Sequence, residues 1–464
     1  MACYTMKKPA RPASRGCRLD SLVKRFIVRR SPTPAAVASP RAVLRKMRDR
    51  VHGEDMDLSV SEEITAIGDA VVRFIDREVA AIERDNHALL SSERQLYDAS
   101  GRYAPEVVAL RKRVRMRSAE LGFYNLFGPT ELGGEGMGAV AAVEIQERVN
   151  AHVGPSRDLV QTVVLPSPFT NGLSPVLVHL DRQVFERHRS ALASGEKTMC
   201  FGLSEPDAGS DVFGMKTRAV RDGDGWVITG TKQWITNAPH ADYAMIFAVT
   251  NEDLVRQRKG GITGFFIETS TRGFSVPSVI PTMGHLGSET GIISLDQVRV
   301  PDEQRLGAVD NGLSVAIGGV SVGRLAMAGS CIGLARWALR QAVDYAAIRK
   351  TGGRPIASHQ AIQTMIARCA TDIYAAKSMT RDCAWRIDQG LPATKQVSMV
   401  KMYATEMLNR VMDQCIQVHG AMGLSNELRL EAGYRWARLL RIPDGTTEIQ
   451  LRTIARHVLA GDLE

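Results

Sequence analysis

The spacing of apolar positions changes twice along this chain and divides it into three parts. In residues 58–197 apolar side chains recur every three or four positions, which predicts amphipathic helices over 64–75 and 107–121. Between about 199 and 306, short runs of β-branched and aromatic residues predict strands, and from about 313 to the end the helical spacing returns. The predicted order is therefore helical, β, helical.

The middle part is expected to form a compact antiparallel barrel. Its apolar runs are separated by Gly, Asp or Pro, and the sequence Asp222-Gly223-Asp224-Gly225 is typical of a hairpin turn. Several short strands without helices between them favour a barrel or a sandwich. The predicted strands cover residues 226–229, 243–250, 262–268 and 292–300.

The last part is expected to be a four-helix bundle, because its long helical stretches are joined by short links. These stretches cover residues 325–348, 362–389, an apolar stripe around 407–416, and 440–459. The chain is thus predicted to be an α+β multidomain protein. Its predicted domains are an N-terminal helical domain over 56–197, a central antiparallel β-barrel over 198–308 and a C-terminal four-helix bundle over 309–464.

The net charge of +9 comes from the N-terminal segment. Residues 1–50 contain 14 Lys or Arg and two acidic residues, whereas the other 414 residues contain 45 basic and 48 acidic ones. We expect residues 1–55 to be a basic, disordered extension. The rest of the chain shows no basic face, so a nucleic-acid partner is not expected. An acid-poor basic N-terminus is also typical of a mitochondrial transit peptide, but 46 Arg against 13 Lys favour a bacterial, cytoplasmic protein.

Composition also limits the kinds of site. The seven cysteines are odd in number and never form Cys-x-x-Cys, which favours a reducing compartment over a disulfide framework. The ten His residues lack zinc-binding spacing, so no metal is expected. The longest apolar stretch, 314–335, is interrupted by Arg324, so no membrane span is expected.

Three short motifs carry the chemistry. They occupy residues 201–211 (FGLSEPDAGSD), 232–237 (KQWITN) and 442–450 (IPDGTTEIQ). Together they resemble the acyl-CoA dehydrogenases, and the resemblance covers about residues 58–460. It implies the same order of parts, FAD as cofactor, an acyl-CoA substrate, an electron-transfer flavoprotein as partner, and a homodimer or homotetramer.

The first two motifs would hold the flavin ring. By resemblance, Trp234 lies against the ring system, Thr236 reaches N5, and Ser210 contacts the CoA moiety. The residues assigned to the pyrimidine edge are Leu203 and Ser204, and Phe201 is also assigned to the cofactor. A plainer interpretation stays open, in which Trp234 is a core residue of a strand and Glu205-Pro206-Asp207 is an ordinary turn.

Two further segments would contact the pyrophosphate and adenine of a flavin held by a neighbouring subunit. By resemblance, the first contributes Arg349, Thr351 and Gln360, and the second contributes Gln417, Gly420 and Ala421. Arg suits phosphate because its guanidinium can bond bidentately. Gly352 departs from the family, which usually has an aromatic there. The alternatives are a solvated helix end and a plain C-terminal cap.

The third motif would supply the base. By resemblance, Asp444 takes the place of the usual glutamate, Gly445 lies at the substrate, and Thr446 and Glu448 lie near the cofactor. Some relatives carry the base before the arginine of an earlier helix, but Gly323 precedes Arg324 here. Arg324 is assigned either to the substrate and base loop or to an internal salt bridge. Asp444 can also be an ordinary helix N-cap.

These assignments predict α,β-dehydrogenation of an acyl-CoA thioester, with Asp444 removing the Cα proton and the hydride leaving Cβ for flavin N5. Two alternatives stay open: an oxidase of the same fold that resembles nitroalkane oxidases, and a catalytically weak scaffold subunit. Acyl-chain specificity is expected to depend on residues 163–171, which contain two prolines.

Overall fold

Helices fill the chain ahead of the sheet. The computed structural model describes residues 59–283 and 287–463, so the predicted extension over 1–55 lies outside the described residues. Ser61 caps the first helix by accepting a hydrogen bond from the Ile64 N–H, and Pro105 begins the helix that contains predicted 107–121. The helices of this part are α3 (Glu62–Phe74), α4 (Ala80–Asp85), α5 (His87–Leu90), α6 (Glu93–Leu96), α7 (Pro105–Glu120), α8 (Gly138–Val153) and α9 (Arg182–Ala193).

An eight-stranded sheet follows, in the order β6-β7-β3-β2-β4-β5-β8, with β1 beside β4. Most neighbours are antiparallel, but β1 runs parallel to β4, and Arg218 of β2 pairs in parallel with Val249 of β4. The predicted hairpin turn is confirmed, because Asp222 pairs with Gly225. The strands are β1 (Met199–Gly202), β2 (Arg218–Asp222), β3 (Gly225–Thr236), β4 (Tyr243–Val249), β5 (Ile262–Glu268), β6 (Phe274–Val279), β7 (Thr290–Pro301) and β8 (Arg305–Leu306), with the short helix α10 (Glu252–Arg256) between β4 and β5.

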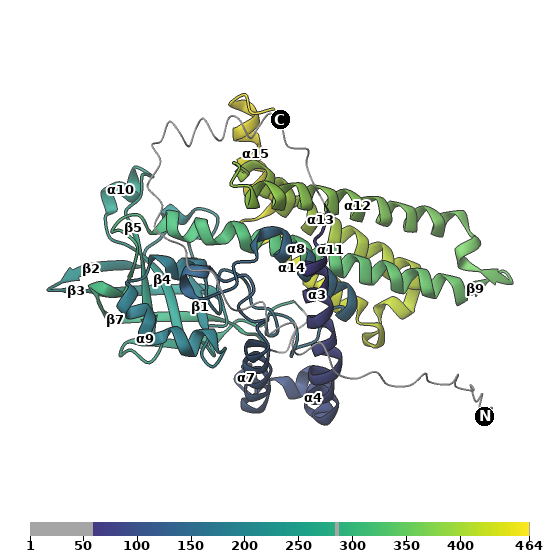
Figure 1. Ribbon diagram of the computed structural model, residues 1–464, viewed down its shortest axis with the longest axis horizontal. Coiled ribbons are helices and arrows are strands. Elements are labelled where there is room, and N and C mark those ends of the chain that lie inside the picture. Colours follow the sequence, from purple (N-terminus) through teal and green to yellow (C-terminus); the bar gives the residue numbers. More distant parts are fainter. Residues whose placement is uncertain (1–58, 284–286, 464) are drawn as a thin grey trace. The chain divides into compact units, whose positions relative to one another are not determined.

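Long helices form the last part, as predicted, and Figure 1 shows them extending away from the sheet. They are α11 (Gly312–Ile348), α12 (Gln360–Asp388), α13 (Thr394–His419), α14 (Leu430–Leu440) and α15 (Thr447–Leu459), with the hairpin β9 (Lys350–Thr351) and β10 (Arg354–Pro355) between α11 and α12. The helix predicted over 440–459 is wrong at its start. Asp444 and Gly445 both have positive φ, which interrupts a helix, so the chain turns between α14 and α15.

Helix α11 is the central element of the bundle. A Cβ added to Gly329 would lie 2.5 Å from the Val143 carbonyl oxygen, so glycine lets α11 approach α8 closely. Among the described residues, α11 is the one helix long and apolar enough to cross a membrane, yet 56% of its most apolar stretch is buried inside the protein. That degree of burial is expected of a core helix.

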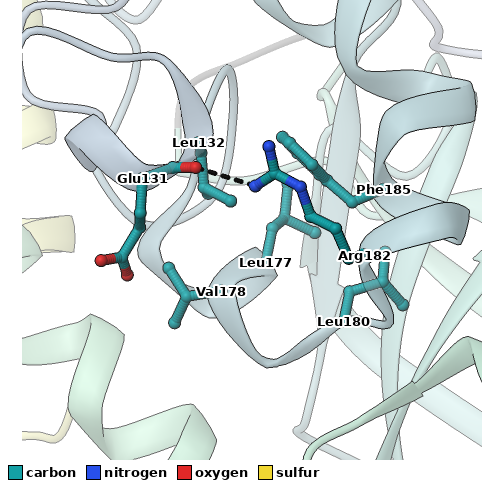
Figure 2. A pocket seen from close by; sticks show the side chains of 7 residues that line it. All are labelled: Glu131, Leu132, Leu177, Val178, Leu180, Arg182 and Phe185. Carbon is teal, nitrogen blue, oxygen red and sulfur yellow. Dashed lines mark hydrogen bonds between the residues drawn. The ribbon is translucent and has the colours of Figure 1, made fainter. Parts of the chain in front are cut away.

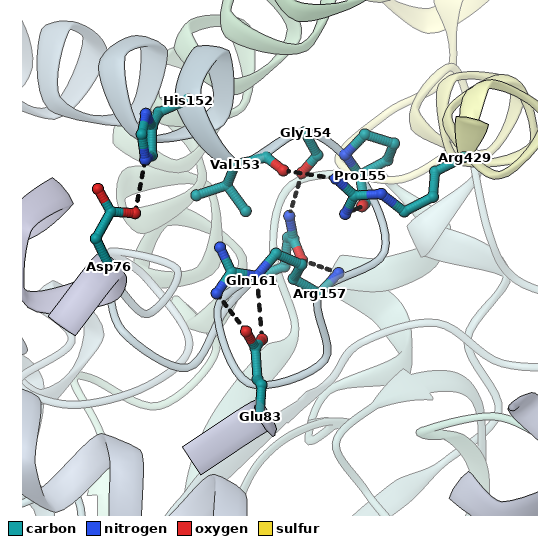
Figure 3. Close-up of polar contacts among 9 residues, drawn as sticks. All are labelled: Asp76, Glu83, His152, Val153, Gly154, Pro155, Arg157, Gln161 and Arg429. Atoms are coloured by element: carbon teal, nitrogen blue, oxygen red, sulfur yellow. Dashed lines mark hydrogen bonds and ion pairs between the residues drawn. The ribbon is translucent and has the colours of Figure 1, made fainter. Parts of the chain in front are cut away.

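The loop after α8 is tied to both helical parts (Figure 3). Arg429, which precedes α14, donates hydrogen bonds to the carbonyls of Pro155 at 2.7 Å and Val153 at 3.2 Å. On the other side of the loop, Arg157 Nε donates to Glu83 Oε1 at 3.0 Å. The start of α14 is therefore fixed against the end of α8, and α14 leads directly to the loop that carries Asp444.

Candidate functional site

Trp234 lies on an irregularity of β3 that turns its indole outward. The pairing of β3 with β7 shifts register between Lys232 and Ile235, as in a β-bulge. Trp234 has φ of +66°, which is unusual for a bulky residue. Its side chain is 56% exposed, whereas Ile235 beside it is buried. Trp234 is therefore not a core tryptophan, and its aromatic face is open to a flat partner.

The first two motifs lie side by side. The Gln233 N–H donates to the Ser204 carbonyl at 3.0 Å, and Lys232 Nζ donates to the Leu203 carbonyl at 3.2 Å. Lys232 also forms a fully buried ion pair with Glu205 at 2.7 Å. Burial lowers the pKa of Lys232 to about 8 despite this partner. The stretch Leu203–Ser204 is thus fixed beside Trp234.

The Glu205 carboxylate organises the rest of this loop. It accepts the backbone N–H groups of Lys216 at 2.6 Å and Thr217 at 3.0 Å. Burial alone would raise the pKa of Glu205, but Lys232 and these donors hold it below its usual value. Glu205-Pro206-Asp207 therefore does form a turn, closed by the Ala208 N–H donating to the Glu205 carbonyl at 3.2 Å, and the buried Glu205 side chain ties this turn to Lys232 of β3.

An aromatic contact connects the first motif to α11. The rings of Phe201 and Phe169 pack edge to face with centroids 5.5 Å apart. A Cβ added to Gly323 would lie 2.5 Å from the Phe169 ring, so only glycine allows α11 to pass here. Arg324 follows directly. Phe169 belongs to the segment 163–171 in which acyl specificity is predicted.

The loop that carries Asp444 is held by side chains from three helices. Arg324 Nε of α11 donates to the Asp444 carbonyl at 2.9 Å, and Lys401 Nζ of α13 donates to the Gly445 carbonyl at 2.8 Å. Gln450 Nε2 of α15 reaches both carbonyls, at 3.1 and 3.0 Å. The N-cap of α15 is Thr446, so the interpretation of Asp444 as an N-cap is wrong.

The charge state of this loop is unusual. Burial raises the pKa of the Asp444 carboxyl, and the positive charges of Arg324 and Lys401 oppose that rise without cancelling it. Burial also lowers the pKa of Arg324, and it lowers that of Lys401 to about 8. A carboxyl with a raised pKa is suited to general base catalysis.

The other predicted residues of this region are near the surface. Thr236 ends β3 opposite Thr290, and its side chain is exposed. Ser210 is exposed beside Asp211, whose carboxylate binds Arg258 at 2.7 Å. Arg452 of α15 also lowers the pKa of Asp211, after Arg258, so α15 lies near this segment. Glu448, on the first turn of α15, is exposed.

The residues predicted to contact a pyrophosphate form a second group at the other end of the bundle. Arg324 and Arg349 are 25 residues apart on and just after α11, which separates them by about 37 Å. Tyr345 stacks on His419 with centroids 4.6 Å apart and brings the ends of α11 and α13 together. The group is exposed and comprises Arg349, Thr351, Gln360, Gln417, Gly420 and Ala421.

Sequence reasoning missed Lys401 and Gln450, which hold the loop, and the Lys232–Glu205 pair. Lys401 had a usable signal. It lies on the apolar stripe of α13 with Val397, Val400 and Ala404, where an unpaired charge would be costly.

A cavity of about 220 Å³ lies elsewhere, between α9 and the loops before it (Figure 2). Arg182 crosses it to donate to the Glu131 carbonyl at 2.9 Å. Its lining residues are Glu131, Leu132, Leu177, Val178, Leu180, Arg182 and Phe185, and none of them is a predicted site residue.

Comparison with known proteins agrees with the motifs. The chain matches the family models of the acyl-CoA dehydrogenase middle domain over residues 200–298 and of the acyl-CoA dehydrogenase C-terminal domain over 310–459. It is 36% identical over 346 residues to the caffeyl-CoA reductase-Etf complex subunit CarC of Acetobacterium woodii, covering 74% of this chain and 88% of that protein.

Two further proteins extend the comparison. The human mitochondrial short-chain specific acyl-CoA dehydrogenase is 33% identical over 369 residues, covering 79% of this chain and 87% of the relative. The solved structure of butyryl-CoA dehydrogenase from Megasphaera elsdenii superimposes with a TM-score of 0.74 at 25% identity, covering 87% of this chain and all of that one.

Proposed function

The chain belongs to the acyl-CoA dehydrogenase family of FAD-dependent oxidoreductases, and we propose that it dehydrogenates an acyl-CoA thioester between Cα and Cβ with Asp444 as the general base. The observation that carries the proposal is the setting of Asp444. It combines a raised pKa with a loop held by three donors, one of which is Arg324 of α11. Family membership fixes the class of reaction, and the assignment of the base is our own step.

The residues around Trp234 fit a flavin. An indole that is 56% exposed on a strained backbone offers an apolar wall, and Gly209 has nothing within 4 Å of an added Cβ, which leaves the neighbouring loop open. Leu203, Ser204 and Thr236 would supply the polar contacts at the ring edge. FAD, when bound, supplies the acceptor for the hydride that leaves Cβ.

Asp444 would take the Cα proton. Its raised pKa brings its protonation equilibrium closer to neutral pH, where a base can both accept and release a proton. Arg324 and Lys401 bind the two carbonyls of the loop, so the backbone that carries Asp444 is held before substrate arrives. Asp suits this backbone, because it adopts the left-handed region more readily than most side chains.

The second group of predicted residues supports an assembly. Arg349 lies about 37 Å along α11 from Arg324, whose neighbour Gly323 packs on Phe169 and, through it, on Phe201 of the first motif. We infer that Arg349, Thr351, Gln360, Gln417, Gly420 and Ala421 contact the flavin of a second copy of the chain, in a homodimer or homotetramer. The Etf complex named for the Acetobacterium woodii relative supports an electron-transfer flavoprotein as electron acceptor.

An anaerobic titration tests the proposed reaction. The purified protein is mixed with acyl-CoAs of graded length and branching, and separately with nitroalkanes, while the flavin absorbance is followed. We expect at least one acyl-CoA to bleach the flavin. In Asp444→Asn, the rate of bleaching should fall about 10²- to 10⁴-fold, as expected for loss of a general base, with flavin content unchanged.

Three outcomes contradict the proposal. Bleaching by a nitroalkane without any CoA thioester would favour the oxidase. A protein that purifies without flavin would favour a scaffold role. Bleaching by an acyl-CoA at an undiminished rate in Asp444→Asn would keep the reaction and remove Asp444 as its base.

A further inference from the structure

Lys401 is a buried lysine on the inner face of α13. Its side chain is completely excluded from solvent, although Lys is almost never fully buried without a partner. Its Nζ donates to the Gly445 carbonyl at 2.8 Å, directly after the proposed base. One hydrogen bond to a neutral carbonyl does not compensate for the cost of removing an ammonium from water, so the presence of this charge requires a further explanation.

The surroundings of Lys401 supply that explanation. The charged and titratable groups that interact with it come from α11, α13, α15 and the loop itself. Of the helices packed on α13, α11 contributes Arg324 and Cys331 and α15 contributes Glu448; the others are Glu406 of α13 itself and Asp444 of the loop. Glu406 accepts hydrogen bonds from Arg441 at 2.7 Å and Thr447 at 2.8 Å. Glu448 is exposed and Cys331 is held neutral by burial, which leaves the half-buried Asp444 as the acid that most needs a cation.

We propose that Lys401 is a positioning residue for Asp444, which fixes the base loop through the Gly445 carbonyl and supplies the positive charge that keeps the neighbouring carboxylate ionised. The inference rests on the proposed role of Asp444. Arg324 acts on the preceding carbonyl from the opposite helix, so the two cations hold successive peptide groups of the loop. Gln450 reaches both carbonyls without adding charge.

The sign of the effect follows from the charges. Burial raises the pKa of the Asp444 carboxyl, and Lys401 limits that rise. Removing the ammonium must therefore raise the pKa of Asp444 further and leave the base protonated over a wider range of pH. The acid limb of the pH profile then moves to higher pH, while a role in folding alone would lower activity equally at every pH.

Lys395 provides a matched control on the same helix. It is also a buried lysine of α13, but its Nζ binds Asp462 Oδ1 at 2.5 Å, close to the C-terminus and away from the base loop. Lys395→Met therefore removes a buried ammonium from the same element without touching the loop of Asp444. We expect this variant to lose stability and to keep the pH profile.

The experiment measures the protonation of Asp444 directly. Infrared spectra of the FAD-loaded protein are recorded across pH, and the carboxylic acid band that disappears in Asp444→Asn is followed. In Lys401→Met and Lys401→Gln, its midpoint should move up by about one pH unit, as expected for loss of an adjacent opposite charge. The acid limb of kcat/KM should move with it, and Lys395→Met should move neither.

The two variants separate the charge from the hydrogen bond and allow for misfolding. The amide of Lys401→Gln can still donate to a carbonyl, so this variant carries the test if Lys401→Met fails to fold. An unchanged midpoint in a folded Lys401 variant, or an equal shift in Lys395→Met, would overturn the proposal. The infrared midpoint needs no substrate, so it remains decisive even if no acyl-CoA reduces the flavin.

Discussion

Asp444 combines three features that a merely structural residue would not keep together. Its backbone lies in the left-handed region, its carboxyl has a raised pKa, and the loop around it accepts hydrogen bonds from a buried lysine and a half-buried arginine. Each of these costs stability unless something compensates for it. Such conflicts between local preference and structure cluster at functional sites, which is why we place the base here.

Burying the ionised carboxylate of Asp444 costs free energy, so a neutral side chain at this position is predicted to stabilise the fold. Because the folded state raises the pKa of Asp444 above its ordinary value of 3.8, the ionised carboxylate disfavours folding at neutral pH. Asp444→Asn should therefore raise the unfolding free energy at pH 7 by on the order of 1 kcal/mol. As pH falls through the raised pKa toward 3.8, the folded protein takes up the proton and the gain should disappear.

Chemical denaturation at several pH values measures this difference. The FAD-loaded wild type and Asp444→Asn are compared between pH 4 and 7, with flavin content matched. A gain that is constant with pH would mean that the substitution acts through packing or backbone preference. A lower unfolding free energy of Asp444→Asn at pH 7 would mean that the attraction of Arg324 and Lys401 for the carboxylate outweighs the cost of burying its charge.

Single residues were the hardest to predict from the sequence. The structure brings the segment of Trp234 beside Ser204, but the outward direction of Trp234 depends on the register shift of β3, which residue spacing does not reveal. Lys401, Gln450 and Arg324 meet at the base loop from three helices. Contacts between residues so far apart in the chain depend on tertiary packing and leave no local pattern.

Strands and helices were predicted well where buried positions recur regularly along the chain. β3, β4, β5 and β7 have buried, β-branched or aromatic cores, and the sequence located all four. β1 and β2 are only four and five residues long, so alternation has too little length to be recognised. The prediction joined Leu440, which ends α14, to α15, because the reversal of the backbone at Asp444 and Gly445 leaves no mark in the spacing of apolar residues.

Glycines of α11 provide a test at the level of elements. A Cβ on Gly329 would meet the Val143 carbonyl oxygen of α8 at 2.5 Å, and backbone cannot yield cheaply. Gly329→Ala should lower the unfolding free energy by about 1–3 kcal/mol. Gly318 of the same helix has nothing within 4 Å of an added Cβ, so Gly318→Ala should stabilise by up to about 1 kcal/mol.

Denaturant midpoints of the two alanine variants decide whether packing against α8 limits α11. Both substitutions raise helix propensity equally, so propensity cancels in the comparison. Equal midpoints would contradict the close contact between α8 and α11. This contact matters for function because α11 carries Arg324 to the base loop.

For the molecule as a whole, the sequence predicted the order of parts and the family but could not say which site residues meet. By resemblance, the motifs divide the cofactor contacts between the flavin of the chain itself and that of a neighbouring subunit. The length of α11 places Arg349 about 37 Å along the helix from Arg324 and so gives that division a physical basis. Figure 1 shows β9, which follows Arg349, at the end of the bundle far from the sheet.

This separation predicts complementation between two defective chains. Trp234→Ala removes the wall for the flavin ring, and Arg349→Glu places a negative charge where a phosphate is expected. Each variant alone should retain little flavin. When the two are co-expressed with different tags and mixed assemblies are isolated, a site formed by Trp234 of one chain and Arg349 of the other is intact, so flavin content should rise well above that of either variant.

The result distinguishes a shared site from two independent effects. If both residues served the flavin of their own chain, every chain in a mixed assembly would carry one defect, and mixing would recover nothing. The double variant Trp234→Ala/Arg349→Glu, co-expressed with wild type, gives the matched control, since it places both defects in one chain. Its mixed assemblies contain the same number of each substitution. In a mixed dimer with shared sites, the intact Trp234 of the wild-type chain meets the substituted Arg349 of the double variant, and the intact Arg349 meets the substituted Trp234, so the dimer should retain little flavin. If each chain served its own flavin, the wild-type chain would keep an intact site and the dimer should retain half.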